Sequence, residues 1–367
     1  MRIPISKKMS MIDSSGIRKV FNLAAKMDNP VNLSIGQPDF DIPEEVKESA
    51  VKAIINGRNK YTLTQGIEEL NRKLLRYYQD LYPQHKPESI MITSGVSGGI
   101  LLAFMAMIDP GDEILIPDPY FVMYKHLINL LGGVPVTYNL YPDFRITEKA
   151  IKPGITKKTK MIIINSPNNP TGMVHSREEI KLVHDIAREH DLFIVSDEIY
   201  DTYVYNNGFT SILEFTDQAM VLKGFSKNFS ATGWRVGFAL APDRIIQEMI
   251  KLQQYTFVCA PAPFQYAILE NLDYDFRKIR EEYAVKRDTI YNALKEKFKV
   301  AKPEGAFYMF PEAPDKKASL FTEKAIKNNL LIIPGNVFSE QDTNFRISFA
   351  APLETLRKGG EILNSLV

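Results

Sequence analysis

Short apolar runs that alternate with helical stretches, from about residue 90 to residue 240, constrain this 367-residue chain more than any other feature. Runs such as MIIINS and LFIVS are continuously apolar, which is typical of strands covered on both faces. Ser176 opens one of the helical stretches with a pattern that resembles a capping box. The seven runs expected to form strands cover residues 90–93, 113–117, 134–138, 161–166, 192–196, 219–225 and 235–240. This alternation predicts an α/β fold, with a mostly parallel seven-stranded sheet sandwiched by helices.

The two ends of the chain show a different pattern. Residues 1–40 contain one possible helix, beginning near Ile17. After about residue 271, a long charged helix precedes three short strand candidates, GAFYMFP, LLIIPG and NFRISFA, and then a terminal helix. We therefore expect a large domain over residues 41–270 and a smaller α+β domain built from residues 1–40 and 271–367.

Composition excludes several classes of protein. The 45 basic residues balance the 44 acidic ones, so neither nucleic acid nor a membrane surface is an expected partner. No stretch approaches the roughly 20 consecutive apolar residues that span a bilayer, and the opening segment lacks the apolar core of a secretory signal. The single cysteine, Cys259, excludes an intramolecular disulfide, and the five histidines show no zinc-like spacing. We expect a soluble, cytoplasmic protein without a metal site.

Four polar segments directly follow apolar runs, where ligands bind in open α/β sheets. They cover residues 93–99 (TSGVSGG), 165–172 (NSPNNPTG), 197–200 (DEIY) and 224–235 (GFSKNFSATGWR). Each has a structural explanation: turn-forming glycine, asparagine and proline, a helix cap at Asp197, and a surface lysine at Lys227. Each also has a functional explanation. In chain order, these are an anion site at a helix start, an amide side chain directed at a ligand, a carboxylate that faces a cation, and an amine whose pKa is lowered by burial.

One cofactor accounts for all four segments better than four unrelated explanations do. Pyridoxal phosphate needs an amine to link it and a carboxylate to keep its ring nitrogen protonated. It also needs donors near its phenolic oxygen and an anion cradle for its phosphate. The sequence offers Lys227, Asp197, Asn169 with Tyr200, and residues 95–97 with Arg235. The four segments therefore predict a pyridoxal phosphate site.

With these residues in place, the chain resembles the fold-type I, pyridoxal-phosphate-dependent aminotransferases of class I/II, which include aspartate, aromatic and kynurenine aminotransferases. The resemblance covers nearly the whole length. It is carried, in order, by LSIGQPDF, KYTLTQGIEEL, NNPTG, SDEIY, SKNFSATGWRVG, GAFY and FRISFA. It implies a ping-pong transfer of the amino group from an L-amino acid to a 2-oxo acid, with 2-oxoglutarate as the expected acceptor.

The resemblance also assigns catalytic roles. Lys227 resembles the lysine that links the cofactor and moves the proton at the amino acid Cα, and Asp197 resembles the partner of the ring nitrogen. Asn169 and Tyr200 resemble the pair at the phenolic oxygen, and Asn169 is expected to contact the substrate as well. The remaining cofactor-binding residues of this subunit are expected to be Gly95, Val96, Ser97, Phe121, Ser226 and Arg235.

Three further positions follow from the resemblance. Arg346 resembles the bidentate clamp on the substrate α-carboxylate, and Gly36 lies where the backbone passes close to the substrate. Tyr61 would reach the phosphate of the neighbouring subunit, which implies a homodimer with shared active sites. Phe121 is expected to stack on the pyridine ring, and Tyr120 takes its place if the register is shifted by one residue.

The chain departs from the family pattern at three places. Gly224 stands where the family often has a phosphate-binding serine. Residues 251–260 lack the arginine that binds a distal carboxylate in one branch, and Ser97 replaces the lysine that does so in another. An acidic donor is therefore disfavoured. Candidates for an apolar or aromatic side-chain pocket are Tyr255, Phe257 and Phe21, for which core packing is the alternative explanation.

Two other functions fit parts of the sequence. A carbon–sulfur β-lyase uses the same scaffold and the same cofactor residues. Aminotransferase-like domains also serve as effector-binding modules of transcription regulators, after a helix-turn-helix unit. Because LSIGQPDF begins at Leu33 and the net charge is near neutral, such a DNA-binding unit is not expected here.

Overall fold

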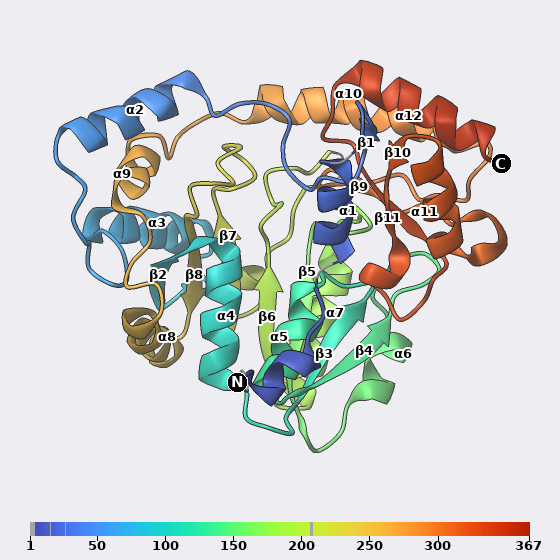
Figure 1. The fold of residues 1–367 in the computed structure, drawn as a ribbon. Coiled ribbons are helices and arrows are strands. Elements are labelled where there is room, and N and C mark those ends of the chain that lie inside the picture. The colour runs from blue at the N-terminus through green and yellow to red at the C-terminus, as the bar shows by residue number, and fades with distance from the viewer. Residues whose placement is uncertain (1–3, 15, 26, 206–207) are drawn as a thin grey trace.

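The computed structural model describes residues 4–14, 16–25, 27–205 and 208–367, without the side chains of residues 19, 21, 22 and 24 (Figure 1). At its centre lies a seven-stranded sheet with the order β2-β8-β7-β6-β5-β3-β4. Its strands are β2 (Ser89–Thr93), β3 (Glu113–Asp118), β4 (Val134–Asn139), β5 (Thr159–Asn165), β6 (Phe193–Asp197), β7 (Ala219–Gly224) and β8 (Gly237–Ala241). Only β8 runs antiparallel to its neighbours. The predicted mostly parallel sheet is confirmed.

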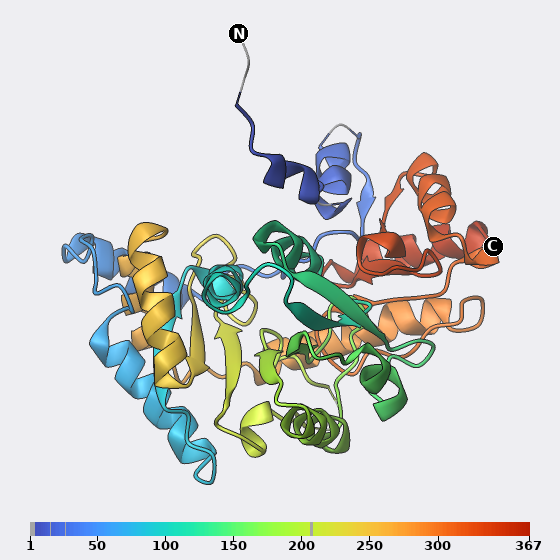
Figure 2. The same cartoon turned by 90° about the horizontal axis from the view of Figure 1, so that it is seen from below.

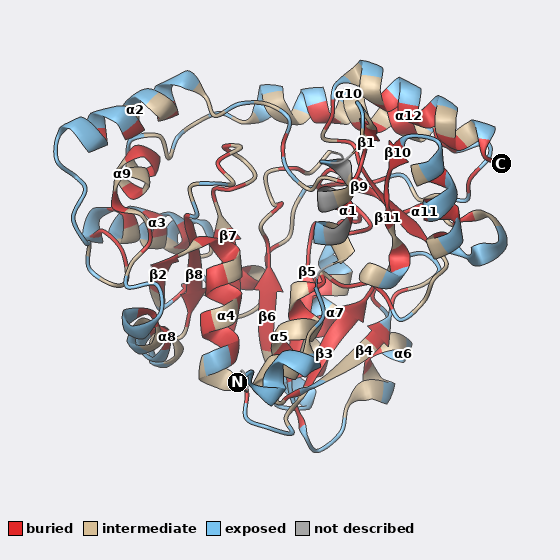
Figure 3. Ribbon diagram, in the orientation of Figure 1, coloured by how far each residue is buried: buried red, intermediate tan, exposed pale blue. Residues whose placement is uncertain are grey.

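Helices cover both faces of this sheet, which is why its strands are continuously apolar (Figure 3). Side chains alternate along each strand, so that Ile194 of β6 enters one core and Val195 enters the other. On the Val195 face lie α4 (Gly95–Met107), α5 (Met123–Leu131) and α8 (Asp243–Tyr255). On the Ile194 face lie α3 (Glu68–Leu81), α6 (Glu148–Ile151), α7 (Arg177–Glu189) and α9 (Ala262–Glu270). Figure 2 shows the two layers of helices from below.

The connection between β7 and β8 breaks the strand–helix alternation. Within the described chain, residues 225–236 contain no helix, and the chain turns straight back so that β8 pairs antiparallel with β7. Arg235, expected at the start of the last strand, instead precedes β8 with a φ of 55°. This loop carries both Lys227 and Arg235, and it leaves them beside the ends of the parallel strands.

A smaller α+β group is built from both ends of the chain, as predicted. Strand β1 (Val31–Asn32) pairs with β10 (Leu330–Leu331), and Leu33 shares a core with C-terminal residues. The other elements are α1 (Gly16–Ala24), α10 (Arg277–Leu294), α11 (Ala318–Lys327), α12 (Leu353–Ser365), and the antiparallel strands β9 (Tyr308–Met309), β11 (Ile333–Pro334) and β12 (Phe345–Ser348). Helix α2 (Glu44–Ile55) packs against α9. The division at residues 40 and 270 stays a prediction.

The described ranges were also searched for two other kinds of feature. None of their helices is long and apolar enough to cross a bilayer. Within the same ranges, no three histidine, cysteine, aspartate or glutamate residues gather in a way that could hold a metal ion.

Candidate active site

A cavity of about 270 Å³ opens at the carboxyl ends of β5, β6 and β7. It brings together residues that are as far apart in sequence as Ile17 and Arg346. Of the residues predicted from the sequence, the cavity is lined by Gly36, Val96, Ser97, Phe121, Asn169, Asp197, Tyr200, Ser226, Lys227, Arg235 and Arg346. Gly95 borders it through Arg235, and Tyr61 does not line it.

Asp197 is the last residue of β6, and its carboxyl group is buried at the mouth of the strand. One oxygen, Oδ2, accepts a hydrogen bond of 2.6 Å from the Tyr124 hydroxyl, and Oδ1 accepts one of 3.2 Å from the Ile199 N–H. Burial raises the pKa of Asp197 to about 6, although the Tyr124 hydrogen bond acts in the opposite direction. No helix begins at this position in the described chain, so Asp197 is not a helix cap.

Lys227 lies in the loop after β7, and its Nζ donates to the carbonyl oxygen of Gly36 at 2.8 Å. Burial of the ammonium group, together with the nearby cations of Arg346 and Arg235, lowers its pKa to about 8. Asp197 alone acts in the opposite direction. At neutral pH, about one tenth of the Lys227 amine is therefore uncharged, far more than for an ordinary lysine.

Arg346 on β12 is a charged group held only by neutral partners. Its side chain is 1% exposed, Nη1 donates to Asn169 Oδ1 at 3.0 Å, and Nη2 donates to the Ser34 carbonyl at 2.8 Å. The guanidinium lies 4.6 Å from the ring centroids of both Tyr308 and Phe338, and Nε has no hydrogen-bond partner. Because no described residue pairs it with a carboxylate, this buried cation is suited to binding an anion.

The start of α4 forms an anion cradle. Gly95 begins the helix with a φ of 68°, and a Cβ atom there would lie 2.6 Å from Nη2 of Arg235. Glycine adopts this backbone conformation without strain, and it has no Cβ atom to block the close approach of the guanidinium. The Ser94 side chain makes no capping hydrogen bond, so the first N–H groups of α4 are left for a ligand.

The missing serine at Gly224 has a packing explanation. A Cβ atom at this position would lie 3.1 Å from a methyl group of Val96 and 3.2 Å from the Cα of Gly237. These distances are shorter than ordinary van der Waals contact, so a serine here would require Val96 and Gly237 to move by a few tenths of an ångström.

The structure distinguishes the two aromatic residues of DPYFVMY that were candidates for stacking, Tyr120 and Phe121. Phe121 lines the cavity and packs edge-to-face against Tyr124, with 5.6 Å between the ring centroids. The Tyr120 hydroxyl instead donates to Glu340, and Tyr120 is not among the lining residues. The cavity therefore receives Phe121, the position expected to stack on the cofactor.

Three of the other aromatic candidates, Tyr61, Tyr255 and Phe257, do not line the cavity of this subunit. Tyr61 is 83% exposed and Tyr255 is 89% exposed. Phe257 is partly exposed and does not line the cavity, although its ring would be 3.6 Å from a Cβ atom at Gly98. The side chain of Phe21 is outside the described part of the structure.

Two tyrosines of the site were not predicted from the sequence. Tyr124 donates to Asp197, and its place one helical turn after Phe121 was the available signal. The Tyr308 hydroxyl lies 2.9 Å from that of Tyr200 and would lie 2.5 Å from a Cβ atom at Gly36. Tyr308 belongs to the GAFY motif, but one sequence does not show which of its residues faces the cavity.

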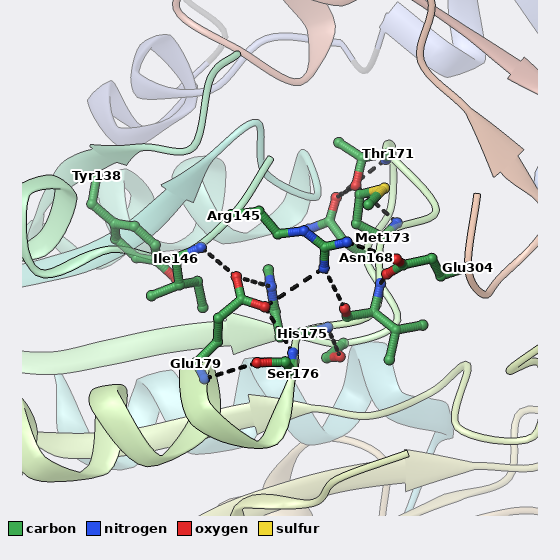
Figure 4. Close-up of polar contacts among 12 residues, drawn as sticks. Tyr138, Arg145, Ile146, Asn168, Thr171, Met173, His175, Ser176, Glu179 and Glu304 are labelled. Atoms are coloured by element: carbon green, nitrogen blue, oxygen red, sulfur yellow. Dashed lines mark hydrogen bonds and ion pairs between the residues drawn. The ribbon is translucent and has the colours of Figure 1, made fainter. Parts of the chain in front are cut away.

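Figure 4 shows polar contacts of Arg145, Glu179 and Glu304 with the segment from Asn168 to Ser176. Arg145 bridges the Val174 carbonyl and the Glu304 carboxylate, at 2.8 Å and 2.6 Å. Burial alone would raise the pKa of Glu179, but His175 and nearby backbone N–H groups bring it down to about 2. These contacts join the NNPTG turn both to the capping box of α7 and to the C-terminal part of the chain.

Comparison with known proteins agrees with this geometry. Residues 28–361 match the family described as aminotransferase class I and II. The chain is 39% identical to a probable aspartate aminotransferase of Methanocaldococcus jannaschii, over 99% of both chains. It is 35% identical to aromatic-amino-acid aminotransferase 2 of Thermococcus litoralis, over 96% of both. The structure of an aspartate aminotransferase from Thermus thermophilus superposes on it with a TM-score of 0.95 and 30% identity, over the full length of both chains.

The family match and the full-length relatives agree with each other, and the seven-stranded sheet is shared with the superposed structure. The chain therefore belongs to the class I and II aminotransferases.

Proposed function

We propose that this aminotransferase works with pyridoxal phosphate in the cavity described above. The residues fit the group by their chemistry. The cradle at Gly95 and Arg235 suits a phosphate, Asp197 suits a ring N–H, and the amine of Lys227 has an uncharged fraction available for an aldehyde. Asn169 and Tyr200 would serve the phenolic oxygen, Phe121 the ring face, and Val96, Ser97 and Ser226 the remaining contacts.

When bound, the cofactor supplies an electron sink for the charge left when the amino acid Cα loses its proton. The ionised carboxylate of Asp197 keeps a proton on the ring nitrogen, and Tyr124 keeps that carboxylate in place. Lys227, once its amine is free, would take the amino acid Cα proton onto its Nζ and pass it to the cofactor. The same residues act in reverse on the 2-oxo acid, which gives a ping-pong cycle.

Arg346 is the observation that carries this proposal. A wholly buried guanidinium with neutral partners and an unpaired Nε is costly unless an anion completes it. A substrate α-carboxylate supplies that anion and leaves the amino acid Cα facing Lys227. Gly36 makes room for the Tyr308 hydroxyl beside this site, since a Cβ atom there would meet that hydroxyl at 2.5 Å.

We propose donors with uncharged side chains. Among the described residues that line the cavity, the cations are Lys227, Arg235 and Arg346. Once these serve the amine, the phosphate and the α-carboxylate, none is left for a second carboxylate. The remaining lining is largely apolar and includes Ile17, Val96, Ile100, Phe121 and Ile199. For the acceptor we propose 2-oxoglutarate on the family resemblance alone. Its distal carboxylate finds no spare cation among the described lining residues, so pyruvate is assayed beside it.

We propose that the enzyme is a homodimer with shared active sites. Five large apolar side chains are exposed on two segments, residues 61–63 and residues 255–258: Tyr61, Leu63, Tyr255, Phe257 and Val258. The segments are joined by hydrogen bonds from Gln253 to the carbonyls of Thr64 and Ile92. A second copy would cover these side chains and bring its own Tyr61 to the phosphate. Such an exposed apolar group is otherwise unfavourable in water.

The proposal is tested by following cofactor absorbance in the purified protein. With pyridoxal phosphate bound, each of the twenty amino acids is added without an oxo acid, and consumption of the visible band identifies the donors. Neutral amino acids are expected to act faster than aspartate and glutamate. Lys227→Ala should show neither the band nor turnover. Sustained release of pyruvate and sulfide from cysteine, without an oxo acid, would instead identify a β-lyase.

Dimerisation is tested by mixing two inactive variants. In a Lys227→Ala/Tyr61→Ala heterodimer with shared sites, one of the two sites keeps both residues, so activity should reappear. If each site used its own Tyr61, the mixed dimer would stay inactive. Sedimentation of the wild-type chain as a monomer would contradict the proposal outright.

A further inference from the structure

A second lysine lies four residues before Lys227, on the other face of the sheet. Lys223 of β7 is 4% exposed, and its Nζ lies 2.6 Å from Asp201 Oδ2 and 3.1 Å from Glu198 Oε2. The amine also lies 5.2 Å from the ring centroid of Tyr78. A cation with two carboxylates and an aromatic face is fully compensated, so it has no free role in binding a ligand.

The two carboxylates come from the segment that presents the site residues. Positions 198 and 201 hold the amine of Lys223, whereas positions 197 and 200 line the cavity. Asp197 meets Tyr124 of α5 on one face of the sheet, and Lys223 meets Tyr78 of α3 on the other. Neighbouring residues at the strand end therefore face opposite ways. Glu198 and Asp201 hold Lys223, whereas Asp197 and Tyr200 face the cavity.

The acidic side of the contact is itself fixed. Glu198 Oε1 accepts hydrogen bonds of 2.9 Å from Ser196, 2.8 Å from Ser211 and 3.3 Å from the Ile212 N–H. Glu198 is 1% exposed, and its backbone N–H donates to Leu222, the residue before Lys223. The turn after β6 is thus tied to β7 by both main chain and side chains.

We propose that Lys223 is a positioning residue for the reaction: together with Glu198 and Asp201 it clamps the turn that aims Asp197 and Tyr200 into the cavity. This inference rests on the proposed function for the roles of Asp197 and Tyr200. The clamp itself is a property of the chain, and it exists without the cofactor.

Two measurements on Lys223→Met test the clamp. Hydrogen–deuterium exchange of the full chain without cofactor should be faster in the peptide that covers residues 196–203. In the presence of pyridoxal phosphate, kcat should fall about 10-fold to 100-fold, as expected when reacting groups move by a fraction of an ångström. KM should change less, because Arg346 is untouched. Glu198→Gln, which keeps Asp201 on Lys223, should show the same effects more weakly and serves if Lys223→Met does not fold.

Leu363→Ala, which truncates a buried side chain of α12 in the smaller group, is the control for general loss of stability. It should lower the melting temperature without faster exchange at residues 196–203. If Lys223→Met and Glu198→Gln behaved like this control, with unchanged kcat and local exchange, Lys223 would be structural only. Failure of the wild type to bind pyridoxal phosphate would overturn the proposed function but leave the exchange result to decide the clamp.

Discussion

Lys223 lies in β7 and Lys227 in the loop that follows it, yet the surroundings of the two amines are opposite in charge. Lys223 lies between two carboxylates, and although burial acts to lower its pKa, Asp201 and Glu198 raise it well above the ordinary value. Lys227 donates to a neutral carbonyl, and burial beside two arginines lowers its pKa to about 8. The compensated amine stabilises the fold, whereas the uncompensated one is available for chemistry.

Arg346 belongs with Lys227 in this comparison. It is buried among neutral acceptors, and burial lowers its pKa. Among the described residues, the hydrogen-bond partners of these two cations are therefore all neutral. We infer that the substrate and the cofactor complete this charge balance, and the predictions below test that contrast.

The largest effect is expected from Lys227→Ala. Loss of a group that both attaches the cofactor and moves a proton should lower kcat by at least about 10³-fold. Lys223→Met should lower it by two orders of magnitude at most. Steady-state kinetics of both variants measures the difference, and equal losses would remove the functional distinction between the two lysines.

Arg346→Met should have the next largest effect. The substrate carboxylate would lose its buried partner, and kcat/KM should fall by about 10²-fold to 10³-fold. Arg346→Lys should recover only part of this loss, since an ammonium group cannot make the bidentate contact. If Arg346→Met bound and turned over substrate like the wild type, the unpaired guanidinium would have another purpose.

Replacement of the two lysines by methionine should change the melting temperature in opposite directions. In the cofactor-free chain, Lys227→Met removes an uncompensated buried cation and should raise the melting temperature by about 1–3 °C. Lys223→Met leaves the carboxylates of Glu198 and Asp201 without their cation and should lower the melting temperature by more than about 5 °C. Calorimetry of the two variants at pH 7 checks both signs, and a loss of stability in both would mean that Lys227 is also compensated.

The smallest effect concerns Asp197 and pH. Its pKa in the fold, about 6, lies above its ordinary value of 3.8, so the folded chain binds the proton more tightly than the unfolded chain does. This contribution to stability is fully present below pH 3.8 and is lost as the pH rises through about 6. Asp197→Asn should remove that part of the pH dependence. Denaturant unfolding of both cofactor-free chains between pH 4 and pH 7 measures this difference. If the free energy of unfolding depended on pH in the same way in both chains, Asp197 would not titrate in this range.

Much of this arrangement could be predicted from the sequence. The continuously apolar runs gave all seven strands, because strands covered on both faces have no polar alternation to obscure them. Lys227, Asp197 and Arg346 each follow or interrupt an apolar segment, which makes a charged residue conspicuous. The family resemblance then placed them in one site, and the cavity does bring them together.

The rest depends on contacts between distant segments. The pairing of Lys223 with Glu198 and Asp201 joins β7 to the turn after β6, and no local sequence pattern predicts it. The Tyr308 hydroxyl reaches Tyr200 across more than one hundred residues. Tyr61 stays exposed in a single subunit, and only a second chain can show where it points.

The most direct measurement identifies the lysine to which the cofactor becomes linked. The purified chain is incubated with pyridoxal phosphate, reduced with borohydride to make the linkage permanent, digested, and analysed by mass spectrometry. Trypsin cleaves after an unmodified Lys223, so the two lysines fall in distinguishable peptides. A pyridoxyl group on Lys227 alone, at about one per subunit, is the result predicted. Label on Lys223, or label spread over surface lysines with none at position 227, would contradict the account.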